Sequence, residues 1–263
     1  MANRHIDLDA LLAIAERQPE GWRHTSREVW GQASARPSPS IGYLRDSAFN
    51  FYYPDNLEAL EAAGAVLVPI SSLAREPLPP GLGALYVGGG FPETHASALS
   101  ANRVLLDSLR YAAERGLPIY AECGGLMLLA DAIRWRGERH AMAGVLPVDV
   151  EVLDRPQGHG YTTLAVDRDN AFFPLGTVLR GHEFHYSRLV ESPATREARR
   201  RTACAVERGT GCGEGRDAVI VGNVWAGYTH LHALGSPEWA VGMVRAARRY
   251  LAGCQLISTK TDA

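Results

Sequence analysis

The first half of the chain alternates between short apolar runs and segments with helical spacing. Pro54 opens one helical segment, and Gly64 and Gly116 follow the ends of two of them. Apolar runs without polar alternation are typical of strands buried on both faces. The alternation therefore predicts a parallel sheet with helices on both faces. We expect strands at 41–45, 65–70, 84–87 and 117–122, and helices at 54–63, 102–115 and 124–133.

The second half has strand-like segments that are separated by turn residues rather than by helices. These segments predict an antiparallel extension of the sheet, so that the whole sheet is mixed. We expect strands at 145–152, 162–166, 177–190, 202–207 and 219–228, followed by one closing helix at 237–251.

The N-terminal segment differs from the rest. A short helix with an apolar face is predicted at 7–17, with Asp7 as its cap. Residues 18–40 show no periodicity and end in Pro37-Ser38-Pro39-Ser40, which indicates a linker. The predicted organisation is an N-terminal helix and linker at 1–40, a compact domain at 41–255 and a tail at 256–263.

Composition excludes several classes of function. The chain has 263 residues, of which 46% are hydrophobic and 21% charged, and its formal net charge is −2. This balance gives no electrostatic reason to expect nucleic acid or an anionic membrane as a partner. No apolar run approaches the roughly 20 residues that span a bilayer, and the first ten residues do not resemble a signal peptide, so we expect a cytoplasmic protein. The four cysteines show no C-x-x-C spacing, which argues against a disulfide framework or a zinc ribbon.

Cys123 lies between an apolar strand and an apolar helix, and two glycines follow it. A sharp strand-to-helix turn strains the backbone of a nucleophile and requires small neighbours. The turn also puts the thiol at the positive end of a helix, which favours the thiolate. The amide of Gly124 would point at a developing oxyanion. A buried structural cysteine is the competing interpretation, although it does not need the flanking glycines.

A second glycine-rich segment, Gly88-Gly89-Gly90-Phe91-Pro92-Glu93, also follows a strand and precedes a helix. Neighbouring strands of a doubly wound sheet end at one crevice. The Gly90 amide is therefore a candidate second donor to an oxyanion beside Cys123. The segment matches neither of the glycine motifs that bind phosphates, and a plain turn is the alternative.

A cysteine that attacks an amide needs a base, which takes its proton and later protonates the leaving ammonia. The strand-like segment 222–232 ends in Thr229-His230-Leu231-His232, so these two histidines are candidates. A histidine with only a structural hydrogen bond is the alternative.

Residues 181–187, Gly-His-Glu-Phe-His-Tyr-Ser, form another polar cluster in apolar surroundings. The spacing of His182 and His185 differs from that of the H-E-x-x-H motif, and strand geometry puts the two side chains on opposite faces. We therefore predict no metal site.

These four motifs, 88–93, 120–127, 181–187 and 228–232, together resemble the glutaminase part of the cobyrinic acid a,c-diamide synthase family, and they occur in the same order. Residues 46–57 resemble the start of that part, and residues 5–13 resemble the end of the domain before it. The resemblance covers almost the whole chain.

The resemblance implies the fold of class I glutamine amidotransferases, a flavodoxin-like mixed sheet with a parallel core. It implies that Cys123 attacks glutamine, that His230 is the base, and that Gly90 and Gly124 line the oxyanion hole. The ammonia would serve ATP-dependent amidation of the a and c acetate carboxylates of a cobyrinic acid-type tetrapyrrole. Candidates for supporting roles are Glu93, His232, His182, Glu183 and His185.

The sequence departs from the wider class in two respects. Many class I members have His-x-Glu, in which the glutamate orients the base, whereas His232 stands at that place here. The third member of the catalytic group is therefore open. The family's synthetase domain, on which ATP and Mg²⁺ are expected, has no counterpart in this sequence. We expect no cofactor in this chain and a separate synthetase domain or subunit as its partner.

Three other functions stay open. In the first, the same glutaminase serves sirohaem or another sirohydrochlorin-derived acceptor. In the second, the chain is a non-catalytic partner of a synthetase. In the third, it is a cysteine hydrolase or peptidase of the same superfamily.

Overall fold

The computed structural model describes residues 7–16 and 38–261. The predicted N-terminal helix is present as α1 (Leu8–Glu16), and Asp7 Oδ1 accepts a hydrogen bond from the Ala10 amide at 3.0 Å, as expected of a cap. Residue 17 of the predicted helix and residues 18–37 of the predicted linker lie outside the described residues, as do residues 262–263 of the predicted tail.

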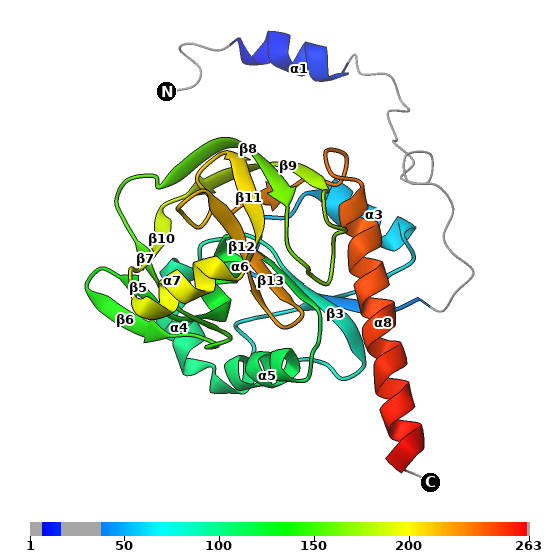
Figure 1. The fold of residues 1–263 in the computed structure, drawn as a ribbon. Coiled ribbons are helices and arrows are strands. Elements are labelled where there is room, and N and C mark those ends of the chain that lie inside the picture. The colour runs from blue at the N-terminus through cyan, green and yellow to red at the C-terminus, as the bar shows by residue number, and fades with distance from the viewer. Residues whose placement is uncertain (1–6, 17–37, 262–263) are drawn as a thin grey trace.

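A ten-stranded mixed sheet forms the centre of the molecule (Figure 1). Its strand order is β14-β9-β8-β11-β12-β13-β4-β3-β1-β2. The pairs from β13 to β2 are parallel, and the remaining pairs are antiparallel, so the predicted parallel core and antiparallel extension are confirmed. The strands are β1 (Ser40–Leu44), β2 (Val66–Ile70), β3 (Leu82–Val87), β4 (Ile119–Glu122), β8 (Gly158–Val166), β9 (Val178–His185), β11 (Thr202–Arg208), β12 (Arg216–Val221), β13 (Val224–Gly227) and β14 (His230–Leu231).

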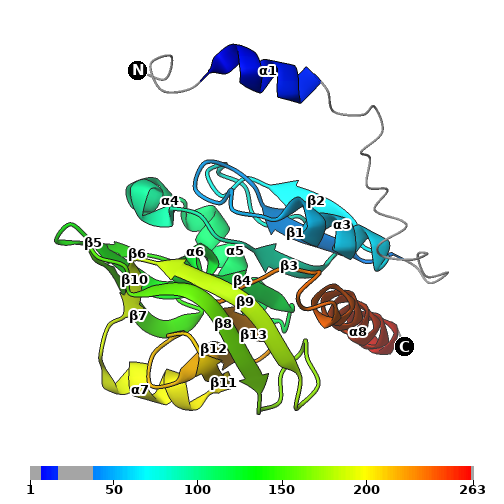
Figure 2. The ribbon, with the colours of Figure 1, turned by 90° about the horizontal axis from the view of Figure 1, so that it is seen from above.

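Helices cover both faces of the parallel half (Figure 2). Side chains alternate between the faces of a strand, so Ala84 and Tyr86 of β3 pack in one core and Leu85 and Val87 in the other. The first core is closed by α3 (Pro54–Ala62) and α8 (Glu238–Thr261), and the second by α5 (Arg103–Glu114) and α6 (Gly124–Leu129). Burial on both faces explains why β3 reads as an unbroken apolar run, whereas β2, at the edge of the sheet, is partly exposed.

A second sheet of four strands shares the core of α5 and α6. Its order is β10-β7-β5-β6. The strands are β5 (Ala130–Trp135), β6 (Glu138–Ala141), β7 (Leu146–Val152) and β10 (Ser187–Leu189). Short helices η2 (Pro92–His95) and α4 (Ala96–Ala101) connect the glycine-rich loop after β3 to α5.

Three expected elements are interrupted. The strand expected at 219–228 is a hairpin of two antiparallel strands, β12 and β13. The helix expected at 124–133 is wrong beyond Leu129, because the chain continues as β5 without a glycine or proline to mark the change. A short apolar run does not by itself distinguish helix from strand. The strand expected at 177–190 is divided at Tyr186 into β9 and β10, which belong to different sheets.

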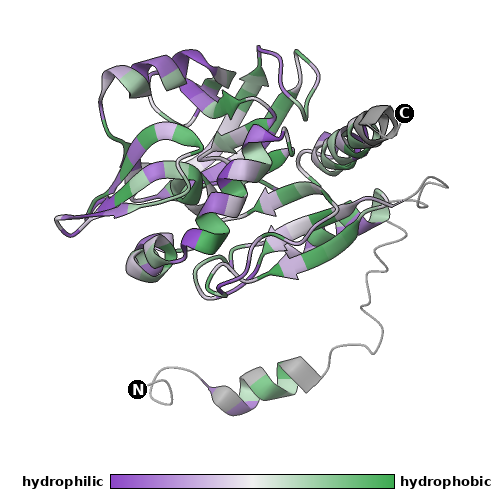
Figure 3. Ribbon diagram, turned by 90° about the horizontal axis from the view of Figure 1, so that it is seen from below, coloured by the Kyte–Doolittle hydropathy of each residue, from purple (hydrophilic) through white to green (hydrophobic). Residues whose placement is uncertain are grey.

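Two helices also differ from expectation. The polar helix α7 (Pro193–Arg200) lies in the half where only turns were predicted, and it is largely hydrophilic (Figure 3). The Ser192 hydroxyl caps it by accepting a hydrogen bond from the Thr195 amide at 3.0 Å. The last helix continues to Thr261, past its predicted end at residue 251 and into the expected tail. Within the two described stretches, no helix is long and apolar enough to cross a membrane.

Candidate active site

The predicted strand-to-helix turn is present at Cys123. Cys123 is the N-cap residue of α6, and its backbone has φ 49° and ψ −98°. Residues other than glycine rarely adopt this conformation. Such a backbone costs about 1–3 kcal/mol and persists only where the surroundings hold it. Two contacts do so. The Cys123 amide donates a hydrogen bond to Gly227 O at 2.8 Å, and Gly125 lies so close to β3 that a Cβ on it would be 2.2 Å from Val87 O. Gly125 therefore lets α6 pack directly on β3.

The amides of Gly90 and Gly124 lie next to each other beside this turn. A Cβ on Gly124 would stand 3.1 Å from Gly90 N, and a Cβ on Gly90 would stand 2.1 Å from Ala48 O. The Cys123 amide is already used by Gly227 O, whereas no acceptor is paired with either glycine amide in the described part of the chain. Among the described residues these two amides are therefore unpaired donors near Cys123.

His230 stands at the start of β14 and is 4% exposed. Its ring lies against the glycine-rich loop, since a Cβ on Gly89 would come within 2.6 Å of His230 Cε1. Its Nδ1 lies 3.5 Å from Glu122 Oε2, an ion-pair distance that is long for a hydrogen bond. No hydrogen-bond acceptor is paired with this nitrogen among the described residues. Burial lowers the pKa of His230, but its interactions with the Cys123 thiol and the Glu122 carboxylate raise it to about 10 overall.

Glu122 is the one member of this group that the sequence analysis missed. Its side chain is buried, and Oε1 accepts a hydrogen bond from the Leu231 amide at 3.1 Å while Oε2 accepts one from the Tyr86 hydroxyl at 3.1 Å. The carboxylate is thereby fixed beside His230. A glutamate at the end of a fully apolar strand was the available signal, because a buried carboxylate needs donors around it.

His232, the other candidate base, points elsewhere. Its Nε2 lies 3.6 Å from Asp55 Oδ2, and its ring centroid lies 4.6 Å from that of Tyr53. A third of its side chain, 33%, is exposed. The strand end therefore brings His230 to Cys123 and turns His232 toward α3.

The 181–187 cluster divides into two groups, as strand alternation predicted. His182 stacks on His230 with ring centroids 5.1 Å apart, and burial together with the charge of His230 lowers the pKa of His182. On the other face, Glu183 accepts the amides of Thr210 at 2.6 Å and Gly211 at 2.9 Å, and lies 3.4 Å from His185 Nε2. Glu183 therefore holds the 209–211 turn against β9. Among the described residues, no group of three or more His, Cys, Asp or Glu side chains is arranged to hold a metal ion.

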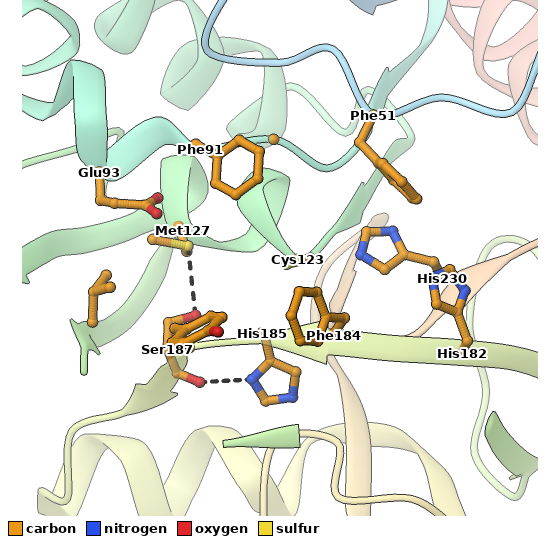
Figure 4. A pocket seen from close by; sticks show the side chains of 13 residues that line it. Phe51, Phe91, Glu93, Cys123, Met127, His182, Phe184, His185, Ser187 and His230 are labelled. Carbon is orange, nitrogen blue, oxygen red and sulfur yellow. Dashed lines mark hydrogen bonds between the residues drawn. The ribbon is translucent and has the colours of Figure 1, made fainter. Parts of the chain in front are cut away.

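One cavity of about 180 Å³ opens at Cys123 (Figure 4). The candidate residues that line it are Gly90, Glu93, Cys123, His182, His185 and His230, whereas Gly124, Glu183 and His232 do not. Its walls are largely apolar. A thiol, a buried imidazole and the unpaired Gly90 amide at one small, largely apolar cavity are parts that acyl transfer uses.

Comparisons with known proteins agree with this chemistry. Residues 40–238 match the family described as the CobB/CobQ-like glutamine amidotransferase domain. The cobyrinate a,c-diamide synthase of Magnetococcus marinus is 40% identical over 253 residues, covering 93% of this chain and 52% of its own length. The enzyme of the same name from Dehalococcoides mccartyi is 40% identical over 94% of this chain and 53% of its own length. The chain thus spans about half the length of these relatives.

The fold also resembles solved structures of low sequence identity. PurLQS from Thermotoga maritima matches with a TM-score of 0.58 at 17% identity, covering 82% of this chain and 99% of that chain. At this identity the likeness concerns the fold alone, and it agrees with the predicted class I glutamine amidotransferase architecture.

Proposed function

The chain belongs to the family of CobB/CobQ-like glutamine amidotransferase domains, and from this premise we propose that it hydrolyses glutamine to glutamate and ammonia at Cys123. One observation carries the proposal: Cys123 in its strained turn and the buried His230 ring line one small cavity, and the buried Glu122 carboxylate lies beside that ring. A cysteine with only a structural role would not need a buried imidazole and carboxylate beside it.

In the first stage, the Cys123 thiolate attacks the carbon of the glutamine carboxamide. A C–S bond forms, and the carbonyl oxygen takes the negative charge, which the amides of Gly90 and Gly124 stabilise. Protonated His230 donates its proton to the carboxamide nitrogen. The C–N bond breaks, ammonia leaves, and a γ-glutamyl thioester remains on Cys123.

In the second stage, neutral His230 takes a proton from water, and the hydroxide attacks the thioester carbon. The intermediate collapses with cleavage of the C–S bond, which releases glutamate and restores the thiolate and imidazolium. Glu122 stabilises the imidazolium and keeps the ring oriented, the part that a buried carboxylate plays in catalytic triads. Glu122 thus fills the third place that the His-x-Glu pattern left open.

The released ammonia, we propose, serves the amidation of the a and c acetate carboxylates of a cobyrinic acid-type tetrapyrrole. Support comes from the relatives named cobyrinate a,c-diamide synthase, of which this chain spans about half the length. Activation of the carboxylates would fall to an ATP- and Mg²⁺-dependent synthetase domain or subunit.

The test of the first step is glutamate release from glutamine by the purified chain, alone and with a synthetase domain and ATP. Cys123→Ala should abolish it, and His230→Ala should lower it by about 10²-fold or more, the usual contribution of a general base. Cys254→Ala is the matched control, since Cys254 is exposed on α8. Retained turnover in Cys123→Ala, or none in the folded wild type under both conditions, would contradict the proposal.

The acceptor is tested separately by mass spectrometry of the amidated product. With the synthetase, ATP and cobyrinic acid, Cys123→Ala should lose glutamine-dependent amidation and keep amidation from ammonium salts. Amidation of a sirohydrochlorin-derived acceptor in place of cobyrinic acid would overturn the acceptor and leave the glutaminase intact.

A further inference from the structure

Glu93 stands out among the residues of the Cys123 cavity. It lies in η2, the short helix that follows the glycine-rich loop, and its carboxylate points into the cavity toward Met127 (Figure 4). It is the only carboxylate among the residues that line this cavity in the described part of the chain, and neither lysine nor arginine lines it.

The charge of Glu93 has no dedicated partner in the described residues. Burial raises the pKa of Glu93, and the effects that oppose this are its own backbone amide and the charge of His95. His95 itself is engaged by the hydroxyls of Ser47 and Thr94, each at 2.9 Å. Keeping a half-buried carboxylate without a cation costs free energy. A cationic ligand in the cavity would offset that cost.

Free glutamine carries such a cation. When its carboxamide is at Cys123, the side-chain methylenes extend away from the thiol and carry the α-ammonium along the cavity wall. Phe91, Met127 and Val152 offer apolar surface to the methylenes. We propose that the Glu93 carboxylate binds the α-ammonium of glutamine, and so distinguishes the free amino acid from carboxamides that lack this charge. The assignment rests on the glutaminase function proposed above.

The test compares glutamine with 4-carbamoylbutanoate, which keeps the carboxamide and the carboxylate and lacks the α-ammonium. A charge-assisted hydrogen bond corresponds to about a 10- to 100-fold change in binding. Glu93→Gln should therefore raise KM for glutamine by about 10- to 100-fold with little change in kcat. For 4-carbamoylbutanoate, wild type and Glu93→Gln should have similar kcat/KM, so that the preference for glutamine collapses in the variant.

Two further variants sharpen the result. Glu93→Asp keeps the charge and should recover part of the preference, whereas Glu114→Gln, on the exposed side of α5, should behave as wild type. Equal losses on both substrates in Glu93→Gln, or an unchanged KM for glutamine, would overturn the role of Glu93 alone. Absence of Cys123-dependent turnover in the wild type would overturn the glutaminase function and this subsite with it.

Discussion

Replacing Glu122 by glutamine tests whether this carboxylate positions the base. The change keeps the volume of the side chain and removes its charge. Its oxygen would still accept the Leu231 amide, which leaves the new NH₂ group facing the Tyr86 hydroxyl and His230 Nδ1. A donor at that place disfavours the protonated ring, because the protonated imidazole also presents a donor there.

The expected magnitude follows from the contact that is lost. A hydrogen bond to a charged group contributes about 1.5–3 kcal/mol, and each 1.36 kcal/mol is a factor of ten. We therefore expect kcat for glutamine to fall by about 10- to 100-fold. The 3.5 Å separation of His230 Nδ1 and Glu122 Oε2 favours the lower end. KM should change little, since Glu122 does not line the cavity.

The pH dependence separates positioning from a general loss of structure. The pKa of His230 is raised to about 10, so the wild-type ring is protonated below that value and loses its proton as the pH rises through it. Activity should therefore fall near pH 10 in the wild type, and at lower pH in Glu122→Gln, because one of the interactions that raise the pKa is gone. Glu114→Gln makes the same change at an exposed position of α5, so it is the matched control and should keep the wild-type profile. Wild-type kcat and an unmoved alkaline limb in Glu122→Gln would refute the reasoning.

Three further changes have expected outcomes. Cys123→Ala should lower the pKa of His230, because burial opposes the charge and one partner is lost; an NMR titration that still gave about 10 would contradict this. Gly125→Ala should lower the free energy of unfolding, measured in urea, by about 1–3 kcal/mol, since the new Cβ overlaps a β3 carbonyl. Gly253→Ala is the comparison: its Cβ would lie in open space on α8, so this variant should be more stable by about 0.5–1 kcal/mol. Asp217→Asn should lower the free energy of unfolding by about 1–3 kcal/mol and reduce glutamate release. The reason is that this buried carboxylate accepts hydrogen bonds from two amides of the segment that carries His230. A wild-type melting temperature with full activity would contradict this expectation.

The sequence predicted the parts of the fold that local patterns determine. Strands buried on both faces were predicted from unbroken apolar runs. The turn at Cys123 was predicted from the two glycines that follow it, Gly124 and Gly125. It did not predict β5, because no glycine or proline marks the helix end at Leu129 and the short mixed segment Ala130–Trp135 does not by itself distinguish helix from strand. The difference is made by pairing with β7, a contact between segments distant in sequence.

The candidate site was predictable to the same extent. Cys123 and His230 stand at strand ends, where parallel topology brings side chains together. Glu122 was missed because its function depends on tertiary contacts with Leu231 and Tyr86. The sequence pattern placed His232 where other members have the orienting glutamate, but only the structure shows that the ring turns toward Asp55.

The position of Glu122 has a mechanical consequence. Glu122 is the last residue of β4 and Cys123 follows it directly, and three contacts tie this strand end to the segment carrying His230. These are Cys123 N to Gly227 O at 2.8 Å, Leu231 N to Glu122 Oε1 at 3.1 Å, and His230 Nδ1 to Glu122 Oε2 at 3.5 Å. A shift of the 227–231 segment relative to β4 would weaken all three together, so the strain at Cys123 and the orientation of His230 depend on the same packing. This arrangement accounts for a buried histidine without a carboxylate two residues after it, because the carboxylate beside its ring comes from the end of β4, across the parallel pair β4·β13.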